Sequence, residues 1–229
     1  MISLALRRVR AFRDLDLAGL EDIAYRGTER RLDPGDPLFE QGEPADHFYL
    51  VIEGRLKVTM LTPDGKQVLV RVIHPGDLCG LALALAGPDF PATCWALVPV
   101  HVMGWPMRYW EELLGNYPRI AIGIIRSLGR HITDVHARIA ELATEEVEQR
   151  VAHAVLRLAR CAGTPVEGGV RVDFPITRQD LAEMTGTTLH SVSRIVSGWA
   201  GRGIVGRGRA SLVIRDLATL ERIGRGEKG

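Results

Sequence analysis

The sequence has little cysteine: Cys79, Cys94 and Cys161 are the three among 229 residues, and no two have Cys-x-x-Cys spacing. An odd number without that spacing argues against a disulfide framework and indicates a reducing compartment. Three cysteines also cannot supply a four-cysteine iron–sulfur cluster, so no such cluster is expected.

Long hydrophobic runs are missing as well. No stretch approaches the roughly 20 apolar residues that cross a bilayer. The N-terminal sequence MISLALRRVRAF lacks the apolar core and cleavage site of a signal peptide. We therefore expect a cytoplasmic protein with no membrane partner.

Motifs of several enzyme classes are also absent. The chain has no G-x-S-x-G elbow, no P-loop, no H-E-x-x-H and no His-x-His pair that could place metal ligands on adjacent strands. The sequence therefore predicts that the protein is not an enzyme and has no catalytic or metal-binding residues.

Charged residues make up 25% of the chain and hydrophobic residues 46%, as in an ordinary soluble protein. The length suffices for two modest domains. Net charge is only +1, but residues 176–229 hold nine Lys or Arg against five Asp or Glu. That excess suits a nucleic-acid partner, although a solvated surface would also account for it.

Residues 29–106 show short β-type segments separated by glycine turns about every ten residues, which predicts a small all-β barrel or sandwich. A long helix is expected over residues 118–144. Its apolar residues follow spacings of 4 and 3, a heptad pattern that favours pairing with the same helix of a second copy. The alternative is packing against its own β domain. The predicted dimer seam comprises Ile125, Leu128, Ile132, Val135 and Ile139.

The stretch ITRQDLAEMTGTTLHSVSR, residues 176–194, predicts two short helices joined by a tight turn. Thr177 can cap the first helix, with Asp180 answering it as a capping box. Gly186 supplies the turn, because a positive φ is cheap only for glycine. Thr187 or Thr188 can cap the second helix.

The second helix divides into two faces. Leu189, Val192, Ile195, Val196 and Trp199 form the expected apolar face, and His190, Ser193, Arg194 and Ser197 share a polar stripe. Such a stripe suits a DNA major groove, where Arg194 could bind guanine, although an ordinary solvated helix is the alternative. Residues 163–169 are expected as a loop. Beyond Trp199, residues 204–214 predict a small hairpin with Arg207 and Arg209 at its tip, placed to meet phosphates.

These motifs, in this order, resemble the winged helix-turn-helix of the Crp/Fnr family of bacterial transcription regulators. Residues 32–80 are similar to the cyclic-nucleotide-binding β-roll that precedes it in that family. The resemblance implies an α+β chain: a double-stranded β-helix (jelly-roll) sensor domain at 1–117, a dimerisation helix at 118–144 and a DNA-binding domain at 145–229. The form TGTTLHSVSR is similar to the nitric-oxide-responsive, denitrification-type branch.

The resemblance implies a homodimer that binds a palindromic operator in double-stranded DNA, with RNA polymerase as a further partner if it activates transcription. The implied DNA contacts are Thr177, Arg178, Gln179, Thr188, His190, Ser193, Arg194, Arg207 and Arg209. One departure is His190, which stands where the family has the glutamate of its E-x-x-S-R motif. The base that His190 reads does not carry over.

Cyclic-nucleotide-binding members need a glutamate for the ribose and an arginine for the phosphate, since a buried phosphate without a counter-charge is costly. Here Leu81 stands at the glutamate position and Pro91 or Ala92 at the arginine position, and no Lys or Arg occurs between Arg71 and Arg108. We therefore expect no cyclic nucleotide. Leu81, Leu83 and Thr93 are the candidate effector-pocket residues.

Three interpretations of the apolar cassette stay open. It could hold an apolar ligand or haem, with ligands drawn from His47, His74, His101, His131, His136 and Cys79. It could simply pack against the long helix and bind nothing. Alternatively, Cys79 or Cys94 could sense thiol-reactive agents, although buried cysteines are commonly inert. The remaining functional alternative is a ligand-binding or redox-sensing β-roll module whose DNA binding does not depend on an effector.

Overall fold

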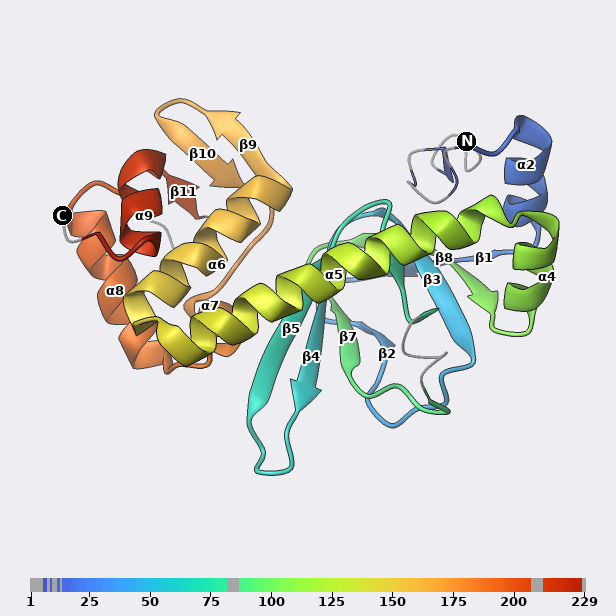
Figure 1. The fold of residues 1–229 in the computed structure, drawn as a ribbon, viewed down its shortest axis with the longest axis horizontal. Helices are drawn as coiled ribbons and strands as arrows, with labels where there is room; N and C mark the ends of the chain where they lie inside the picture. Colours follow the sequence, from blue (N-terminus) through green and yellow to red (C-terminus); the bar gives the residue numbers. More distant parts are fainter. Residues whose placement is uncertain are drawn as a thin grey trace. The chain divides into compact units, whose positions relative to one another are not determined.

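The computed structural model describes residues 6, 7, 9, 12, 14–81, 87–206 and 212–227. It forms two compact units (Figure 1). The first combines Met1–Lys66 with Val70–Asp134, and the second combines Gln67–Leu69 with Val135–Gly229. Leu83, Arg207 and Arg209, which the sequence predicts as functional, lie outside the described residues.

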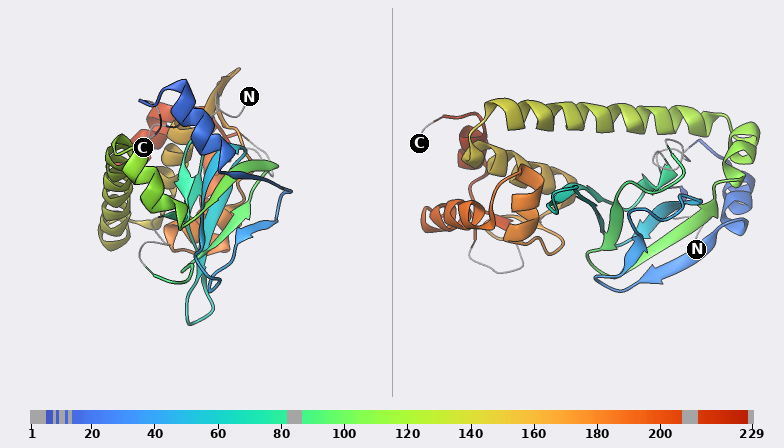
Figure 2. Two further views of the ribbon diagram at one scale, coloured as in Figure 1. Left: turned by 90° about the vertical axis from the view of Figure 1, so that its right-hand side faces the viewer. Right: turned by 90° about the horizontal axis from the view of Figure 1, so that it is seen from below.

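The first unit contains a β-roll. After helix α2 (Leu17–Tyr25), eight strands follow: β1 (Thr28–Leu32), β2 (Pro37–Phe39), β3 (His47–Glu53), β4 (Leu56–Leu61), β5 (Gln67–Ile73), β6 (Leu78–Cys79), β7 (Thr93–Ala96) and β8 (Val100–Pro106). They form two four-stranded sheets, in the orders β1-β8-β3-β6 and β2-β7-β4-β5 (Figure 2). All the inter-strand pairs between β1, β3, β6 and β8 are antiparallel.

The roll has a core between its sheets and a second core under its helices. Phe39 and Phe90 stack inside the roll with ring centroids 3.9 Å apart. The second core joins α2, helix α4 (Tyr109–Asn116) and the start of the next helix. At its centre the Trp105 indole N–H donates to the Ile23 carbonyl at 2.8 Å. Burying the indole with its donor paired avoids the cost of an unsatisfied polar group.

Helix α5 (Arg119–Thr144) is the long helix expected at residues 118–144. Its first turns are anchored by Ile120 and Ile124, which are buried in the core of the first unit. Beyond them a row of large apolar side chains stays exposed, comprising Ile125, Leu128, Ile132, Ile139 and Leu142. The helix therefore buries only its beginning within one copy of the chain.

The second unit contains α6 (Val147–Ala162), β9 (Gly163–Val166), β10 (Gly169–Val172), α7 (Arg178–Thr185), α8 (Leu189–Gly201), β11 (Val213–Ile214) and α9 (Leu217–Gly224). Its strands form one sheet in the order β11-β10-β9 (Figure 1). The α+β fold class is thereby confirmed. The prediction of a loop at residues 163–169 is wrong. Most of this stretch forms strand β9, which belongs to a hairpin that pairs Val166 with Gly169.

Helix α6 lies at the centre of the second unit's core. Val151 and Val155 of α6 are fully buried, together with Val192 of α8. The Trp199 indole N–H donates to Glu148 Oε1 at 2.8 Å and so ties α8 to the start of α6. In the described parts of the chain, no helix combines the length and apolar character needed to span a membrane.

Candidate nucleic-acid interface

Helix α7 begins with the capping box that the sequence predicts. Thr177 Oγ1 accepts the Asp180 N–H at 3.0 Å, and Asp180 Oδ2 accepts the Thr177 N–H at 2.9 Å. Asp180 is almost fully buried, while Thr177, Arg178 and Gln179 are exposed. The capping box supplies hydrogen-bond acceptors for N–H groups at the helix start and so fixes the backbone position of the three exposed residues.

The turn between α7 and α8 also follows the expected chemistry. Gly186 adopts φ +61°, a left-handed conformation, and its N–H donates to the Ala182 carbonyl. Thr188, rather than Thr187, caps α8: its Oγ1 accepts the Ser191 N–H at 3.1 Å. The start of α8 is thus held by local hydrogen bonds on both sides of the turn.

Helix α8 presents the predicted polar stripe to solvent. His190, Arg194 and Ser197 are exposed and Ser193 is half-buried. Val192, Val196 and Trp199 face the opposite way, into the core. A helix anchored on one side leaves its other face free to enter a groove.

The prediction for Leu189 is wrong. The spacing assigned it to the apolar face, yet its side chain is 49% exposed. Leu189 is the first residue of α8, so its side chain stands at the edge of the helix, before the turns that pack on the core. It precedes the buried Val192 and Val196 on the same side of the helix, and apolar periodicity alone could not reveal that this first position stays open to solvent.

The base of the predicted wing is present. Val205 bridges Ile214, and the Gly206 N–H donates to the Val213 carbonyl at 2.7 Å. The Arg215 N–H donates to the Ile204 carbonyl at 2.8 Å. The residues on either side of 207–211 are therefore paired as the two arms of a hairpin.

The candidate effector residues in the first unit lie in two different surroundings. Leu81 is 4% exposed and packs in the core under the helices. Ala92 is 5% exposed and packs between the sheets. Thr93 Oγ1 accepts the Gln41 N–H at 3.0 Å. Leu81 and the two sequence neighbours of Thr93, Ala92 and Cys94, therefore belong to different cores.

Two of the candidate histidine ligands have acidic neighbours. His47 Nδ1 lies 2.7 Å from Asp46 Oδ1, and His101 Nε2 lies 2.7 Å from Glu29 Oε2. Over the described ranges, no three or more His, Cys, Asp or Glu side chains converge as a metal site would require. His131 and His136 lie on α5.

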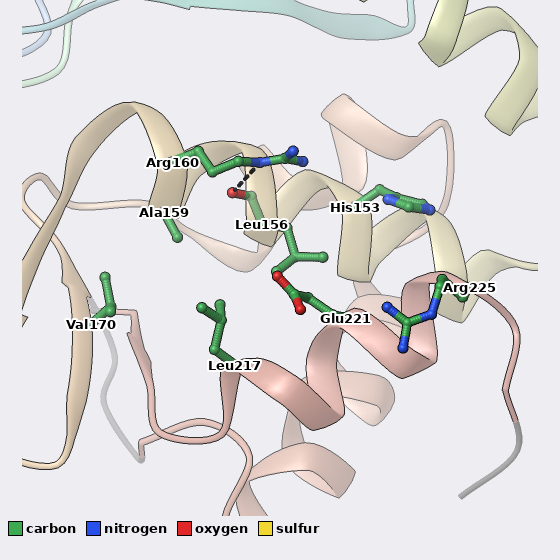
Figure 3. A pocket seen from close by; sticks show the side chains of 8 residues that line it. All are labelled: His153, Leu156, Ala159, Arg160, Val170, Leu217, Glu221 and Arg225. Atoms are coloured by element: carbon green, nitrogen blue, oxygen red, sulfur yellow. Dashed lines mark hydrogen bonds between the residues drawn. The ribbon is translucent and has the colours of Figure 1, made fainter.

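Sequence reasoning missed a surface pocket in the second unit, of about 270 Å³, between α6, β10 and α9 (Figure 3). Its lining residues are His153, Leu156, Ala159, Arg160, Val170, Leu217, Glu221 and Arg225. Charges of both signs surround an apolar floor, and His153 Nε2 also lies 3.4 Å from Glu145 Oε1. No motif marks these residues, which come from three separated elements.

A β-roll unit followed by a long helix and a winged helix-turn-helix unit defines a DNA-binding regulator of two-domain type. The cyclic nucleotide-binding domain family matches residues 29–117, and the Crp-like helix-turn-helix domain family matches residues 149–223.

Similar proteins span nearly the same length. The transcriptional regulator LdrP of Thermus thermophilus is 30% identical over 190 residues, which are 82% of this chain and 92% of that protein. A CRP-like cAMP-activated global transcriptional regulator of Mycobacterium tuberculosis is 27% identical over 210 residues, 89% of this chain and 93% of that one. The crystal structure of a CRP-family transcriptional regulator from Thermus thermophilus has a TM-score of 0.73 at 29% identity and covers 86% and 96% of the two chains. The chain belongs to the Crp/Fnr family of transcription regulators.

Proposed function

We propose that the protein acts as a homodimer that binds a palindromic DNA site by placing α8 of each copy in the major groove. The observation that carries this proposal is the exposed stripe of His190, Ser193 and Arg194 on a helix whose other face is buried. Because the Thr188 cap and the Trp199 hydrogen bond anchor the helix, these side chains stand in a fixed register before DNA arrives. Preorganisation lowers the ordering cost of binding.

Each exposed side chain has a chemically suitable partner on DNA. The Arg194 guanidinium can fork onto O6 and N7 of a guanine. Ser193 and His190 can bond base edges or phosphates, and Thr188 lies at the N-terminus of α8, where anions are favoured. Thr177, Arg178 and Gln179, at the start of α7, suit the phosphate backbone, as do Arg207 and Arg209 in the wing.

The dimer would form along α5. Its exposed apolar row follows heptad spacing, and Ile125 at 67% exposed, Ile132 at 53% and Ile139 at 58% are unusually open for isoleucine. Leu128 and the half-exposed Val135 complete the row. A second α5 in parallel covers it with side chains of the same kind. Two recognition helices related by a two-fold axis then read half-sites about one helical turn, ~34 Å, apart.

The sensor unit supports an effector other than a cyclic nucleotide. The side chain at the expected phosphate position is the buried methyl of Ala92 or the ring of Pro91, and Leu81 replaces the ribose acceptor. Arg71, the last arginine before that segment, has its guanidinium 3.6 Å from the Asp77 carboxylate. An incoming phosphate would therefore lack a dedicated cation. Haem stays an open candidate, because the carboxylates beside His47 and His101 each engage only one ring nitrogen, and effector-independent DNA binding stays the alternative.

A fluorescence-anisotropy titration tests the DNA proposal. The palindromic duplex is first selected from a random pool by the wild-type protein. We expect Arg194→Ala to weaken binding to that duplex by about 5- to 150-fold per half-site, the range of 1–3 kcal/mol for a lost bidentate base contact. Arg222→Ala is the matched control, because Arg222 is exposed on α9. Equal effects of the two substitutions would contradict the proposal.

The sensor proposal has a separate test. Cyclic AMP and cyclic GMP are titrated into the wild-type protein by calorimetry, and their effect on the DNA titration is measured. We expect no saturable heat and no change in DNA affinity. Saturable binding of either nucleotide at micromolar concentration would overturn the assignment while leaving the DNA proposal untouched.

A further inference from the structure

Two buried cysteines meet across the β-roll. Cys79 ends β6 in one sheet, and Cys94 lies in β7 of the other. Their Sγ atoms are 4.0 Å apart. Cys79 is 4% exposed and Cys94 is fully buried. The two thiols therefore touch each other in the core, although neither sheet pairs with the other at this point.

The geometry is close to that of a disulfide. A disulfide needs an S–S separation of about 2.05 Å, so the two sulfur atoms must approach by roughly 2 Å. Rotation about the Cα–Cβ bonds of the two cysteines moves their sulfur atoms and contributes to this approach. Disulfides between facing sheets are well accommodated in β-sandwich cores. Antiparallel pairing holds both backbones in place: Cys79 opposes Tyr49, and Cys94 opposes Val58.

We propose that Cys79 and Cys94 are a redox site of the sensor unit and form a reversible intramolecular disulfide that ties its two sheets together. The cysteines are 15 positions apart and stand at the two ends of the segment that carries the effector cassette. The bond would therefore close that segment, residues 80–93, into a loop. In a reducing compartment such a bond is transient and suited to sensing rather than to permanent stabilisation.

The chemistry balances with hydrogen peroxide as the oxidant. The Cys79 thiolate, on the more accessible of the two residues, attacks one peroxide oxygen, and the O–O bond breaks to give a sulfenic acid and hydroxide, which takes up the Cys79 proton as water. Cys94 then attacks the sulfenic sulfur, and its proton leaves with the hydroxyl group as a second water. Two thiols are oxidised by two electrons, and one peroxide is reduced to two waters.

The surroundings of Cys94 fit the second of these roles. The hydrogen bond with the Cys79 thiol, followed by burial, raises the pKa of the Cys94 thiol well above its ordinary value, while the charge of Arg71 acts in the opposite direction. Cys94 thus stays protonated and unreactive until a sulfenic acid forms beside it. A small, neutral oxidant is required, because bulky reagents cannot reach either sulfur.

The test uses full-length Cys161→Ser protein, because Cys161 is exposed and would form bonds between molecules. Reduced protein is treated with hydrogen peroxide, denatured in N-ethylmaleimide and mapped by peptide mass spectrometry. We expect both remaining thiols to be lost together and alkylation to recover fully after dithiothreitol. Because no Lys or Arg lies between the two cysteines, the protein is cleaved with endoproteinase Asp-N, which cuts before Asp89, and we expect a peptide pair joined through Cys79 and Cys94. Protein that keeps two alkylatable thiols under peroxide conditions that oxidise Cys161 in the wild type would overturn the proposal.

Two further variants test the order of the steps. In Cys94→Ala, Cys79 should accumulate as a sulfenic acid that dimedone captures. In Cys79→Ala, the buried Cys94 should stay alkylatable. Oxidation of Cys79 to sulfinic acid in protein that still has Cys94, with no joined peptide, would also overturn the proposal. Because peptide mapping of the Cys161→Ser protein needs neither substitution, the test stands even if an alanine variant fails to fold, and it does not depend on DNA binding.

Discussion

The two units hold their important side chains in different ways. In the second unit, the hydrogen bonds that cap the starts of α7 and α8 join residues three apart, such as Thr177 with Asp180 and Thr188 with Ser191, while the Trp199–Glu148 bond holds α8 against α6. In the first unit, the comparable bonds span long stretches of chain. The Gln41 N–H and Thr93 Oγ1 are 52 positions apart, and the Trp105 indole and the Ile23 carbonyl are 82 apart.

This difference has a consequence for the two surfaces. Local hydrogen bonds fix the start of α8, so the register of this helix does not depend on distant parts of the chain. Contacts between distant segments tie the roll together as a whole, so a change at one point is transmitted through packed neighbours. In the proposed regulator, a rigidly held α8 and a sensor unit with coupled segments suit a signal that changes the orientation of the helices rather than their conformation.

The largest effect is expected where the two units are joined by α5. Ile132→Glu places a charge in the centre of the proposed dimer seam, once from each copy. Two like charges facing each other in an apolar interface cost several kcal/mol. We expect the dimer dissociation constant to rise at least about 1000-fold, or roughly 4 kcal/mol, as measured by sedimentation velocity.

Ala137→Glu is the matched control for that substitution, because Ala137 is exposed on the same helix and outside the heptad row. It should leave the dimer intact. If Ile132→Glu also stays dimeric, copies of the chain meet elsewhere, and α5 would connect the units without joining two chains.

A smaller effect, on the free energy of unfolding, is expected when alanine replaces a turn glycine in each unit. Gly54, between β3 and β4, has φ +88°, and an added Cβ would lie 2.4 Å from the Pro99 carbonyl oxygen. Gly186 has φ +61°, and there the nearest atom is Leu142 Cδ2 at 3.2 Å, the end of a flexible side chain. We expect Gly54→Ala to destabilise the first unit by about 3 kcal/mol or more, and Gly186→Ala to destabilise the second by about 1–2 kcal/mol.

Differential scanning calorimetry of the two variants checks this expectation, with Gly129→Ala as the control because Gly129 is helical and open to solvent. Similar losses of unfolding free energy for Gly54→Ala and Gly186→Ala would show that the backbone around Gly54 moves as easily as the Leu142 side chain. The proposed difference between a unit held by local contacts and a unit held by contacts between distant segments would then be overstated.

The same contrast explains what the sequence could predict. Capping residues, the Gly186 turn and the polar stripe are local patterns, so they predicted α7, α8 and their exposed residues correctly. Glycine spacing predicted a small all-β barrel or sandwich over residues 29–106, but not which strands pair. The contact between Cys79 and Cys94 depends on how the two sheets face each other, and no short-range pattern carries that information. Leu189 was misplaced because periodicity does not say where a core ends.

The smallest effect on DNA affinity is expected for Arg178, and it tests whether the start of α7 contacts phosphates while α8 contacts bases. Arg178 is the first residue of α7 and is exposed, a position suited to phosphate rather than base contact. Each phosphate contact contributes about 0.9 to the slope of log affinity against log salt. Because a dimer carries two copies, Arg178→Ala should lower that slope by about 2 and weaken all duplexes by the same factor. Arg194→Ala should instead narrow the difference between the selected palindrome and a random duplex. Measuring the affinity for both duplexes across a salt series separates phosphate contact from base contact. If Arg178→Ala lost its preference for the palindrome, α7 would also contact the bases, and base recognition could not be assigned to α8 alone.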